Sequence, residues 1–483
     1  MKQTVIRVGN VISRIDATWE TMIAVDKELA VEVPGAIWAM RNRPGWDGFW
    51  HPLSIQNGTF PTGLLERVKK YLILARVEDE RVRPHTIPFI PKILKDIDLA
   101  DHQVDAVKAF LEKGQGIIGL SVGSGKTEVA VAGAMHIDGK CIWITHRKDL
   151  FHQTAERIKL RTGETAAMIG DGGWDEIKDT TKFVIAMPQT IGKDMRFFLQ
   201  QVNGANTIIL DEIHRSAAST EFFKIAQMIP AYFRIGLSGT LELGDAVRER
   251  RLEAATGPVL IKLKSSDMAK IGWVVPAQVI YHKIRNQILH GVEYMDARRM
   301  LIEENVDRNA KVIELAMDSA KAGKRCLVIC DTVRHAKLIA EVLRGEDVRS
   351  RLMTGQNASS QRMEAKKDLR SGALEIMISS PIWDEGVDLP ELEVVIIAAG
   401  GKSAARFIQR CGRALRRSPG KDKATVHDFF DMGSRYTVRH SVSRIRACQN
   451  EGFEVVGLDQ EISALMSRVP KEESTRQAWS PRW

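Results

Sequence analysis

The chain has 483 residues, of which 44% are hydrophobic and 27% are charged. At about 150 residues per domain, this length predicts roughly three domains with sizeable cores, and the composition excludes a largely disordered chain. Lysine and arginine outnumber aspartate and glutamate by 70 to 61, and the resulting charge of +9 favours an anionic partner. No apolar run approaches the ~20 residues of a membrane helix, and no apolar signal segment opens the chain. We therefore expect a cytoplasmic protein with no membrane partner.

Five cysteines are scattered along the chain: Cys141, Cys326, Cys330, Cys411 and Cys448. They are too few and too dispersed for a disulfide framework. Cys326 and Cys330 belong to an apolar run and lack a second pair of ligands, so we expect buried thiols and not a zinc site. Reduced cysteines agree with a reducing compartment.

The first 98 residues differ from the rest and predict a small α+β domain. Turn-forming residues are frequent between Asn42 and Gly63, where short β runs alternate with them. A helix is expected from Leu64 to Leu74. A linker with three prolines follows, at Pro84, Pro88 and Pro91.

From residue 99 onward the chain repeats a short apolar run, a polar or glycine-containing loop and a helical segment. The runs of a first unit are IIGLSV, KCIWIT, KFVIAM, TIILDE and FRIGLSG, and those of a second are RCLVICD, EIMISS, EVVIIAAG and ATVHDFFD. This rhythm predicts two α/β domains, each with a parallel sheet covered by helices on both faces. We place these domains at residues 99–260 and 261–457, with a polar tail at 458–483 whose end is expected to fray.

A phosphate-binding loop is predicted where the strand IIGLS runs into VGSGKT and a helical pattern. Gly123, Ser124 and Gly125 would turn their backbone N–H groups toward phosphate oxygens. Lys126 supplies a cation for the β and γ phosphates of ATP, and the Thr127 hydroxyl can bind Mg²⁺. The strict pattern has glycine where Leu120 stands, so a chance match in a βα turn is the alternative.

Two carboxylates, Asp211 and Glu212, end the apolar run TIILDE. A nucleotide hydrolase needs one carboxylate to hold Mg²⁺ and one to orient the attacking water, and we assign these roles to Asp211 and Glu212. Alone, the pair could be a solvated strand end. Its place downstream of the phosphate loop favours nucleotide hydrolysis. His214 could be a metal ligand, but coupling of the nucleotide site to the SGT segment is the more plausible role.

Several segments together resemble the motifs of superfamily 2 helicases, in that family's order. They include LADHQVDAV, DEIH, SGT, WDEGVDLPELEVVI and QRCGRALR. The resemblance implies two RecA-like domains in tandem with ATP in the cleft between them. It implies that Gln103 recognises the adenine base. It also implies that Arg413 and Arg416 are arginine fingers, which stabilise transition-state charge. Further nucleotide contacts are implied for Gly386, Asp388 and Gln409.

The same resemblance implies other roles. Coupling residues are His214, Ser238 and Thr240. The segments ITHRKDLFHQT and AMPQTI resemble motifs that contact the nucleic-acid backbone. The candidate nucleic-acid-binding residues are His146, Arg147, Gln189, Thr190 and Thr354. The chain departs from the family at Leu120, at Val122 in place of a common threonine, and in having SGT for the more frequent SAT, but no catalytic group is missing.

Within this superfamily the chain resembles the UvsW-type and XPB-type DNA helicases. The segments that carry this likeness are ATGPVLIKLKSSDMAKIGWVVPAQV, IEENVDRNAKVIELA and, for UvsW-type enzymes, RNRPGWDGFWHPLSIQNGTFPTGLLERVKKYL. The resemblance implies an ATP-dependent DNA helicase or translocase with ATP and Mg²⁺ as cofactors. It would move 3′→5′ and remodel forks, Holliday junctions, D-loops or R-loops in replication, recombination or repair. We expect a monomer in a bacterial or phage-infected cell, acting on branched or partly single-stranded DNA, with RNA–DNA hybrids and replication or recombination proteins as further partners.

Basic residues concentrate between Lys402 and Lys423, where eight of them accompany one acid. Lys402, Arg417, Lys421 and Lys423 are ambiguous between phosphate contact and plain surface. In the N-terminal domain, which holds 14 basic and 12 acidic residues, the candidates for duplex contact are Arg41, Arg43, Lys69 and Lys70. We expect the aromatic cluster of Trp46, Phe49 and Trp50 to form the core of this small domain, and favour this over stacking on nucleic-acid bases. For Arg439, His440, Arg444 and Arg446 near the end, a solvated helix face is slightly favoured.

Three other functions stay open on the residues alone. An RNA helicase is one, although the N-terminal resemblance favours DNA. A nucleotide-gated module that binds or anneals DNA with little unwinding is another, although the intact Lys126, Asp211 and Glu212 favour turnover. The third is the motor subunit of a restriction complex, which would need a partner because no nuclease constellation is visible in the sequence.

Overall fold

The computed structural model describes residues 3–36, 40, 45–213, 220–239, 245–380 and 389–470. Contacts divide the chain into two units, and each is described by itself. The first comprises Met1–Leu120 with Gly125–Lys262, and the second comprises Ser121–Ser124 with Leu263–Trp483. Within the described part of the chain, no helix has the length and apolar character needed to cross a membrane.

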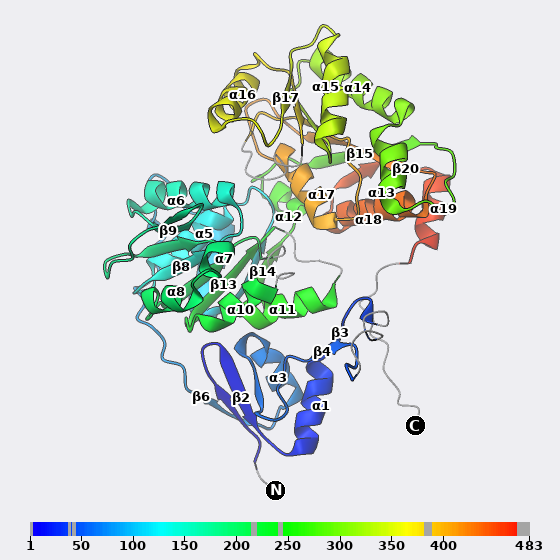
Figure 1. Cartoon of the computed structure of the whole chain (residues 1–483). Coiled ribbons are helices and arrows are strands. Elements are labelled where there is room, and N and C mark those ends of the chain that lie inside the picture. Colours follow the sequence, from blue (N-terminus) through cyan, green and yellow to red (C-terminus); the bar gives the residue numbers. More distant parts are fainter. Residues whose placement is uncertain are drawn as a thin grey trace, which may run out of the picture. The chain divides into compact units, whose positions relative to one another are not determined.

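The first unit begins with a small α+β domain built on a four-stranded sheet of order β5-β2-β1-β6 (Figure 1). β1 pairs antiparallel with β2 and parallel with β6, and its residues alternate between core and solvent. The predicted helix at 64–74 is shorter in the structure, because a 3₁₀ turn precedes it and it ends at Tyr71. The elements are β1 (Val5–Val8), β2 (Ile12–Asp16), α1 (Trp19–Leu29), β3 (Val31–Glu32), β4 (Phe49–Trp50), β5 (Thr59–Pro61), η1 (Thr62–Leu64), α3 (Leu65–Tyr71) and β6 (Arg76–Asp79).

This domain packs tightly on a helix of the same unit, α11 (Ala246–Thr256). A Cβ on Gly63 would lie 2.0 Å from the carbonyl oxygen of Glu253, so only glycine permits this approach. Arg67 Nε donates to both carboxylate oxygens of Glu253 at 2.7 Å. The Trp50 ring meets Phe223 edge-on at 6.1 Å. The expected core role of the aromatic cluster therefore agrees with the packing of Trp50.

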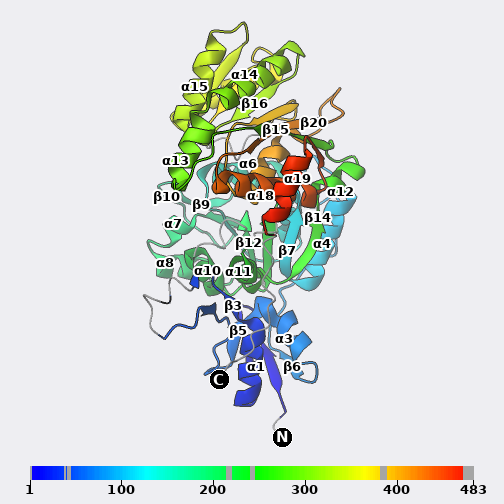
Figure 2. The same cartoon turned by 90° about the vertical axis from the view of Figure 1, so that its right-hand side faces the viewer.

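The first unit continues with an eight-stranded sheet of order β10-β9-β11-β8-β12-β13-β7-β14 (Figure 2). Its central strands pair parallel to one another, and β10 is antiparallel to β9 at the edge. Alternate residues of β8, β11 and β12 pack against α7, α8, α10 and α11 in one apolar core. The elements are α4 (Asp101–Lys113), β7 (Gln115–Leu120), α5 (Lys126–Met135), β8 (Cys141–Ile144), α6 (Lys148–Thr162), β9 (Ala167–Gly170), β10 (Gly173–Trp174), β11 (Phe183–Ala186), α7 (Pro188–Ile191), α8 (Met195–Gln201), β12 (Thr207–Leu210), α10 (Thr220–Met228), β13 (Phe233–Ser238) and β14 (Val259–Leu263).

The second unit holds a seven-stranded sheet of order β17-β18-β16-β19-β20-β15-β21, with all its pairs parallel. One face packs on α17 and α18 and the other on α14 and α15, so both faces are covered. The elements are α12 (Ser265–Lys270), β15 (Ala277–Ile284), α13 (Tyr294–Arg298), the π-helix η2 (Arg299–Glu303), α14 (Val306–Lys321), β16 (Cys326–Ile329), α15 (Val333–Arg344), β17 (Ser350–Met353), α16 (Ser359–Ser371), β18 (Ile376–Ser379), β19 (Val394–Ile397), α17 (Ala404–Cys411), η4 (Gly412–Ala414), β20 (Ala424–Asp431), α18 (Arg435–Glu451), β21 (Glu454–Val456) and α19 (Gln460–Arg468).

The predicted strand runs all form strands, namely β7, β8, β11, β12 and β13 in the first sheet and β16, β18, β19 and β20 in the second. The predicted fold class, two RecA-like parallel-sheet domains after a small α+β domain, is confirmed. The five cysteines are buried and free, as expected.

Candidate active site

The candidate groups of the first sheet follow the carboxyl ends of neighbouring parallel strands. In spatial order, Gln189 and Thr190 follow β11, His146 and Arg147 follow β8, Asp211 and Glu212 follow β12, Ser238 ends β13 and Lys126 follows β7. Because parallel strands end at the same edge of a sheet, these side chains share one edge. The nucleotide candidates follow β7 and β12, the coupling candidate Ser238 ends β13 between them, and the nucleic-acid candidates follow the adjoining β8 and β11.

The phosphate loop has the backbone that its glycines permit. Gly123 and Gly125 have φ values of +83° and +81°, in the left-handed region, and Gly125 caps α5. The Ser124 hydroxyl donates to the carbonyl of Ser121 at 2.7 Å. The Lys126 ammonium donates to the carbonyl of Leu120 at 3.1 Å. Leu120 therefore contributes its backbone to this turn, and a side chain at that position does not prevent the loop from forming.

Gln103 lies against this loop and is buried. Its Oε1 accepts from the backbone N–H of Ala100 at 3.0 Å, at the start of α4. Its Nε2 lies so close to Gly125 that a Cβ there would be 2.1 Å away. Gln103 thus fixes α4 next to the phosphate loop, and its contact with adenine stays a prediction.

The two carboxylates after β12 differ in environment. Asp211 is buried, and burial together with the neighbouring Glu212 raises its pKa to about 7. Asp211 accepts from two donors: the backbone N–H of Glu212 at 2.9 Å and, more weakly, the indole Nε1 of Trp143 at 3.4 Å. Glu212 has a φ of +45°, which a non-glycine residue rarely adopts and which is typical of strained functional positions.

These residues fit a magnesium ion. A buried carboxylate with a raised pKa is a group that a divalent cation would satisfy, because the cation restores the charged form. The Thr127 hydroxyl, in the first turn of α5, is the second oxygen that the sequence assigns to the ion. Asp211 and Thr127 are the residues that would hold Mg²⁺ with ATP.

The sequence analysis missed Trp143. This tryptophan is fully buried in β8, and only its indole N–H marks it as more than an apolar core residue. A tryptophan inside an otherwise aliphatic strand, KCIWIT, was the available signal, because a buried indole N–H usually requires an acceptor.

In the second unit, Gln409 ends α17 as a buried side chain, and Arg413 and Arg416 follow it, both half-buried. Three of the ambiguous basic residues make hydrogen bonds within the second unit. Lys421 is buried and donates to the carbonyls of Pro390, Leu392 and Arg416 at 2.6 to 2.9 Å. Arg417 donates to the carbonyl of Gly272, and Lys423 to the side chain of Gln278. Lys421 is therefore structural, whereas Arg417 and Lys423 are exposed and phosphate contact stays a prediction for them.

The closing helix α18 also differs from the expected solvated face. Arg444 is buried and pairs with Asp428 at 2.7 Å. Arg446 donates to the carbonyls of Met466, Val469 and Pro470, which fixes the end of α19. Both arginines therefore hold the fold, and the solvated interpretation is wrong for them.

The remaining nucleic-acid candidates vary in exposure. Gln189 is exposed, and His146, Arg147 and Thr190 are half-buried. Thr354 is buried directly after β17, and its backbone N–H donates to Asn357 Oδ1 at 2.7 Å. This bond gives Thr354 a turn-forming role of its own.

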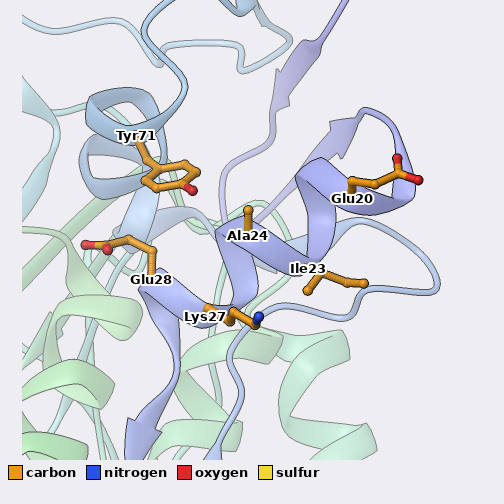
Figure 3. A pocket seen from close by; sticks show the side chains of 6 residues that line it. All are labelled: Glu20, Ile23, Ala24, Lys27, Glu28 and Tyr71. Atoms are coloured by element: carbon orange, nitrogen blue, oxygen red, sulfur yellow. The ribbon is translucent and has the colours of Figure 1, made fainter. Parts of the chain in front are cut away.

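The N-terminal domain has a charge-balanced surface. Lys69 pairs with Glu66 at 3.2 Å, while Lys70 is exposed. On the sheet, Arg7, Arg14 and Arg76 pair with carboxylates of neighbouring strands. A shallow groove between α1 and α3, in which the Tyr71 ring faces α1, mixes acidic, basic and apolar side chains (Figure 3). Among the described residues, Lys70 is the strongest remaining candidate here for contact with a duplex.

Six predicted site residues lie outside the described residues. They are Arg41, Arg43, His214, Thr240, Gly386 and Asp388. Their roles stay predictions from the sequence.

Comparison with known proteins agrees with this geometry. Residues 96–243 match the family described as "Type III restriction enzyme, res subunit", and residues 307–418 match "Helicase conserved C-terminal domain". The chain is 25% identical over 418 residues to the DNA 3′-5′ translocase XPB2 of Sulfurisphaera tokodaii, covering 78% of this chain and 91% of that one. It is 23% identical over 489 residues to the ATP-dependent DNA helicase uvsW of Enterobacteria phage T4, covering 92% and 96%.

Solved structures support the fold. An ATP-dependent Type ISP restriction-modification enzyme, LlaBIII bound to DNA, matches 78% of this chain and 33% of its own with a TM-score of 0.59 at 14% identity. Dbp5 of S. cerevisiae, bound to RNA and ADP BeF3, matches 77% and 98% with a TM-score of 0.51 at 16% identity. The fold, the two matched domains and the relatives together define a superfamily 2 helicase, an ATP-hydrolysing enzyme. Within this superfamily the chain resembles the UvsW-type and XPB-type helicases.

Proposed function

We propose that the chain is an ATP-dependent DNA helicase or translocase that moves 3′→5′ and unwinds or remodels branched DNA. The observation that carries the proposal is the shared edge of the first sheet, where Lys126, Asp211 and Glu212 adjoin the groups after β8 and β11. Binding or hydrolysis of the nucleotide can then affect a bound DNA strand, because the residues that contact each of them follow neighbouring β-strands. DNA as substrate and the polarity are supported by the relatives described as a DNA 3′-5′ translocase and a DNA helicase.

Each predicted site residue has its own role in ATP binding and hydrolysis. The N–H groups of the phosphate loop and Lys126 bind the phosphates, while Asp211 and Thr127 would hold Mg²⁺, whose charge would supply neutralisation of the phosphates. Glu212 orients the attacking water. Arg413 and Arg416 act as finger residues, Gln103 and Gln409 contact the nucleotide, and Ser238 couples its state to the strand.

The proposal extends to the organisation of the chain. Its domains are those predicted from the sequence, 1–98, 99–260 and 261–457 with a tail at 458–483, except that α19 (Gln460–Arg468) packs on the core of the second unit. The small domain contributes to DNA binding. The enzyme works as a cytoplasmic monomer in replication, recombination or repair. RNA–DNA hybrids are a further substrate.

The test is steady-state ATP hydrolysis with single-stranded DNA, duplex DNA, a four-way junction or RNA as separate stimulators. We expect the strongest stimulation by junction DNA and its loss in Glu212→Gln, which keeps the carboxylate proposed to hold Mg²⁺. Forked DNA with a single 3′ or 5′ arm then tests polarity, because a 3′→5′ motor needs the 3′ arm. Stimulation by RNA alone would overturn the choice of DNA. ATP binding without turnover on any nucleic acid would favour a nucleotide-gated clamp.

A further inference from the structure

A cationic cavity lies at the carboxyl edge of the second sheet and contains none of the predicted nucleotide contacts. Its volume is about 240 Å³, and its walls come from the ends of β16 and β19 and from α13, α17 and α18. Five of its six charged side chains are cationic. The charged lining residues are Arg298, Asp331, Lys402, Arg406, Arg410 and Arg444.

Two of the cations already hold the walls. Arg410 pairs with Asp331 at 2.8 Å, and Asp331 also accepts from the backbone N–H of Gly400 at 3.1 Å. Arg444 pairs with Asp428 and donates to the carbonyl of Gly401 at 3.1 Å. The loop from β19 to α17 is thereby fixed from two sides, so the cavity is built before any ligand arrives.

Arg298 and Lys402 have donors to offer. Arg298 pairs through Nη2 with Glu303 at 2.8 Å, but its Nε is buried with no hydrogen-bond partner among the described residues. A buried guanidinium N–H without an acceptor is unfavourable, and an anion oxygen or an ordered water would satisfy it. Lys402 is exposed, and no carboxylate of the described residues lies within 4.0 Å of its ammonium nitrogen. Arg406, in the first turn of α17, is exposed and lines the same cavity.

We propose that this cavity binds a backbone phosphate of the nucleic-acid strand, with Lys402 and Arg406 making the ionic contact and Arg298 Nε donating to a phosphate oxygen. The inference rests on the proposed function, since it assigns a new contact to the same strand. Arginine favours phosphate because its planar donors match phosphate oxygens. The half-buried Tyr294, which forms part of the wall, offers the apolar surface that a sugar or base next to the phosphate requires.

The test compares Lys402→Gln/Arg406→Gln with a matched control, Lys321→Gln/Arg344→Gln. The control removes the same charges from the ends of α14 and α15, which lie at the opposite edge of the same sheet. Binding of labelled oligothymidine is measured by anisotropy over a series of salt concentrations. Each lost phosphate contact lowers the slope of log K against log salt by about 0.7 for a single strand. We expect that decrease in the cavity variant and no change in the control.

Three results separate the possibilities. If wild type binds no nucleic acid, the proposed function fails before the cavity is tested. If wild type binds and the cavity variant keeps the wild-type slope, the inference about the cavity is overturned alone. A parallel calorimetric titration uses inorganic phosphate without DNA. Phosphate binding that the variant loses, together with an unchanged DNA slope, would show that the cavity takes a small free anion and not a strand.

A second variant checks the buried donor. Arg298→Lys keeps a cation but removes Nε, so it should weaken strand binding while retaining most of the salt slope. Thermal unfolding of each variant shows that it is folded. An unchanged affinity in folded Arg298→Lys would remove Arg298 from the site.

Discussion

The buried carboxylates of the two sheets have different partners. In the second, Arg308 pairs with Asp431 and Arg444 pairs with Asp428, each at 2.7 Å, and all four side chains are buried. In the first, Asp211 is buried and accepts from an indole N–H and a backbone N–H, and burial together with Glu212 raises its pKa to about 7 although the charge of Lys126 opposes that rise. The second sheet uses its charges to hold elements together. The first keeps a carboxylate that a cation can satisfy, which is a property of a reactive site.

The largest effect should follow from Asp211→Asn. Hydrolysis should fall by about 10³-fold or more, because charge stabilisation by a bound metal contributes several kcal/mol. The nucleotide-free protein should become more stable at pH 8. The raised pKa means that the folded state holds its proton longer than the unfolded state, so stability falls as pH rises from about 4 to 7. Asparagine removes that loss.

Thermal unfolding of Asp211→Asn and wild type at pH 5.5 and pH 8 tests this expectation. The increase in stability of the variant over wild type should be greater at pH 8. The control is Asp105→Asn, at an exposed position on α4 of the same unit. Equal gains at both pH values would show that Asp211 is ionised throughout and would remove the contrast between the sheets.

Breaking a pair in the second sheet should have the next largest effect. Arg308→Met leaves Asp431 buried without its cation and should destabilise the protein by about 3–5 kcal/mol. The double variant Arg308→Met/Asp431→Leu should lose less than the single one, because no charge stays unpaired. Urea unfolding measures both. Losses that simply add in the double variant would show that the two residues do not act as a pair.

The sequence predicts the strands of this molecule well because an apolar run is a local signal, while the roles of the groups that follow these strands stay predictions. An apolar run followed by a glycine-rich or acidic loop identifies β7 with Lys126 and β12 with Asp211. The strands β9 and β10 escaped notice because AMIG and GW are short and weakly patterned. Contacts between distant residues were equally invisible. Trp143 and Asp211 are 68 positions apart, and a chain read linearly does not show which acceptor an indole finds.

The basic residues also show that a sequence pattern does not reveal contacts between distant residues. Lys402, Lys421 and Arg444 look alike in sequence as members of basic segments. In the structure Lys421 binds three carbonyls, Arg444 binds an aspartate, and Lys402 stays exposed. The direction in which a side chain points depends on how its helix or strand packs in the fold. A local sequence pattern does not predict that packing.

Lys421→Ala should therefore destabilise the second unit by about 1–3 kcal/mol, because three carbonyls lose their donor. Urea unfolding gives this value. The salt slope of DNA binding should stay at the wild-type value, in contrast to that of the Lys402→Gln/Arg406→Gln variant. A reduced slope in a stable Lys421→Ala protein would show that this lysine contacts phosphate and would weaken the contrast between structural and exposed charges.

The smallest effect is expected from Trp143→Phe, which removes one weak donor from Asp211. Loss of the indole N–H disfavours the ionised carboxylate, so its pKa should rise further, by about 0.3–0.5 unit for a bond worth roughly half a kcal/mol. Under the proposed role of ionised Asp211 in hydrolysis, the acidic limb of the pH profile of kcat/KM for ATP should move to higher pH by that amount. Trp174→Phe, at the edge of the same sheet, is the matched control and should leave the midpoint in place. A packing defect alone would lower stability without moving the midpoint, so an unshifted profile in Trp143→Phe would show that the indole serves the core and not the carboxylate.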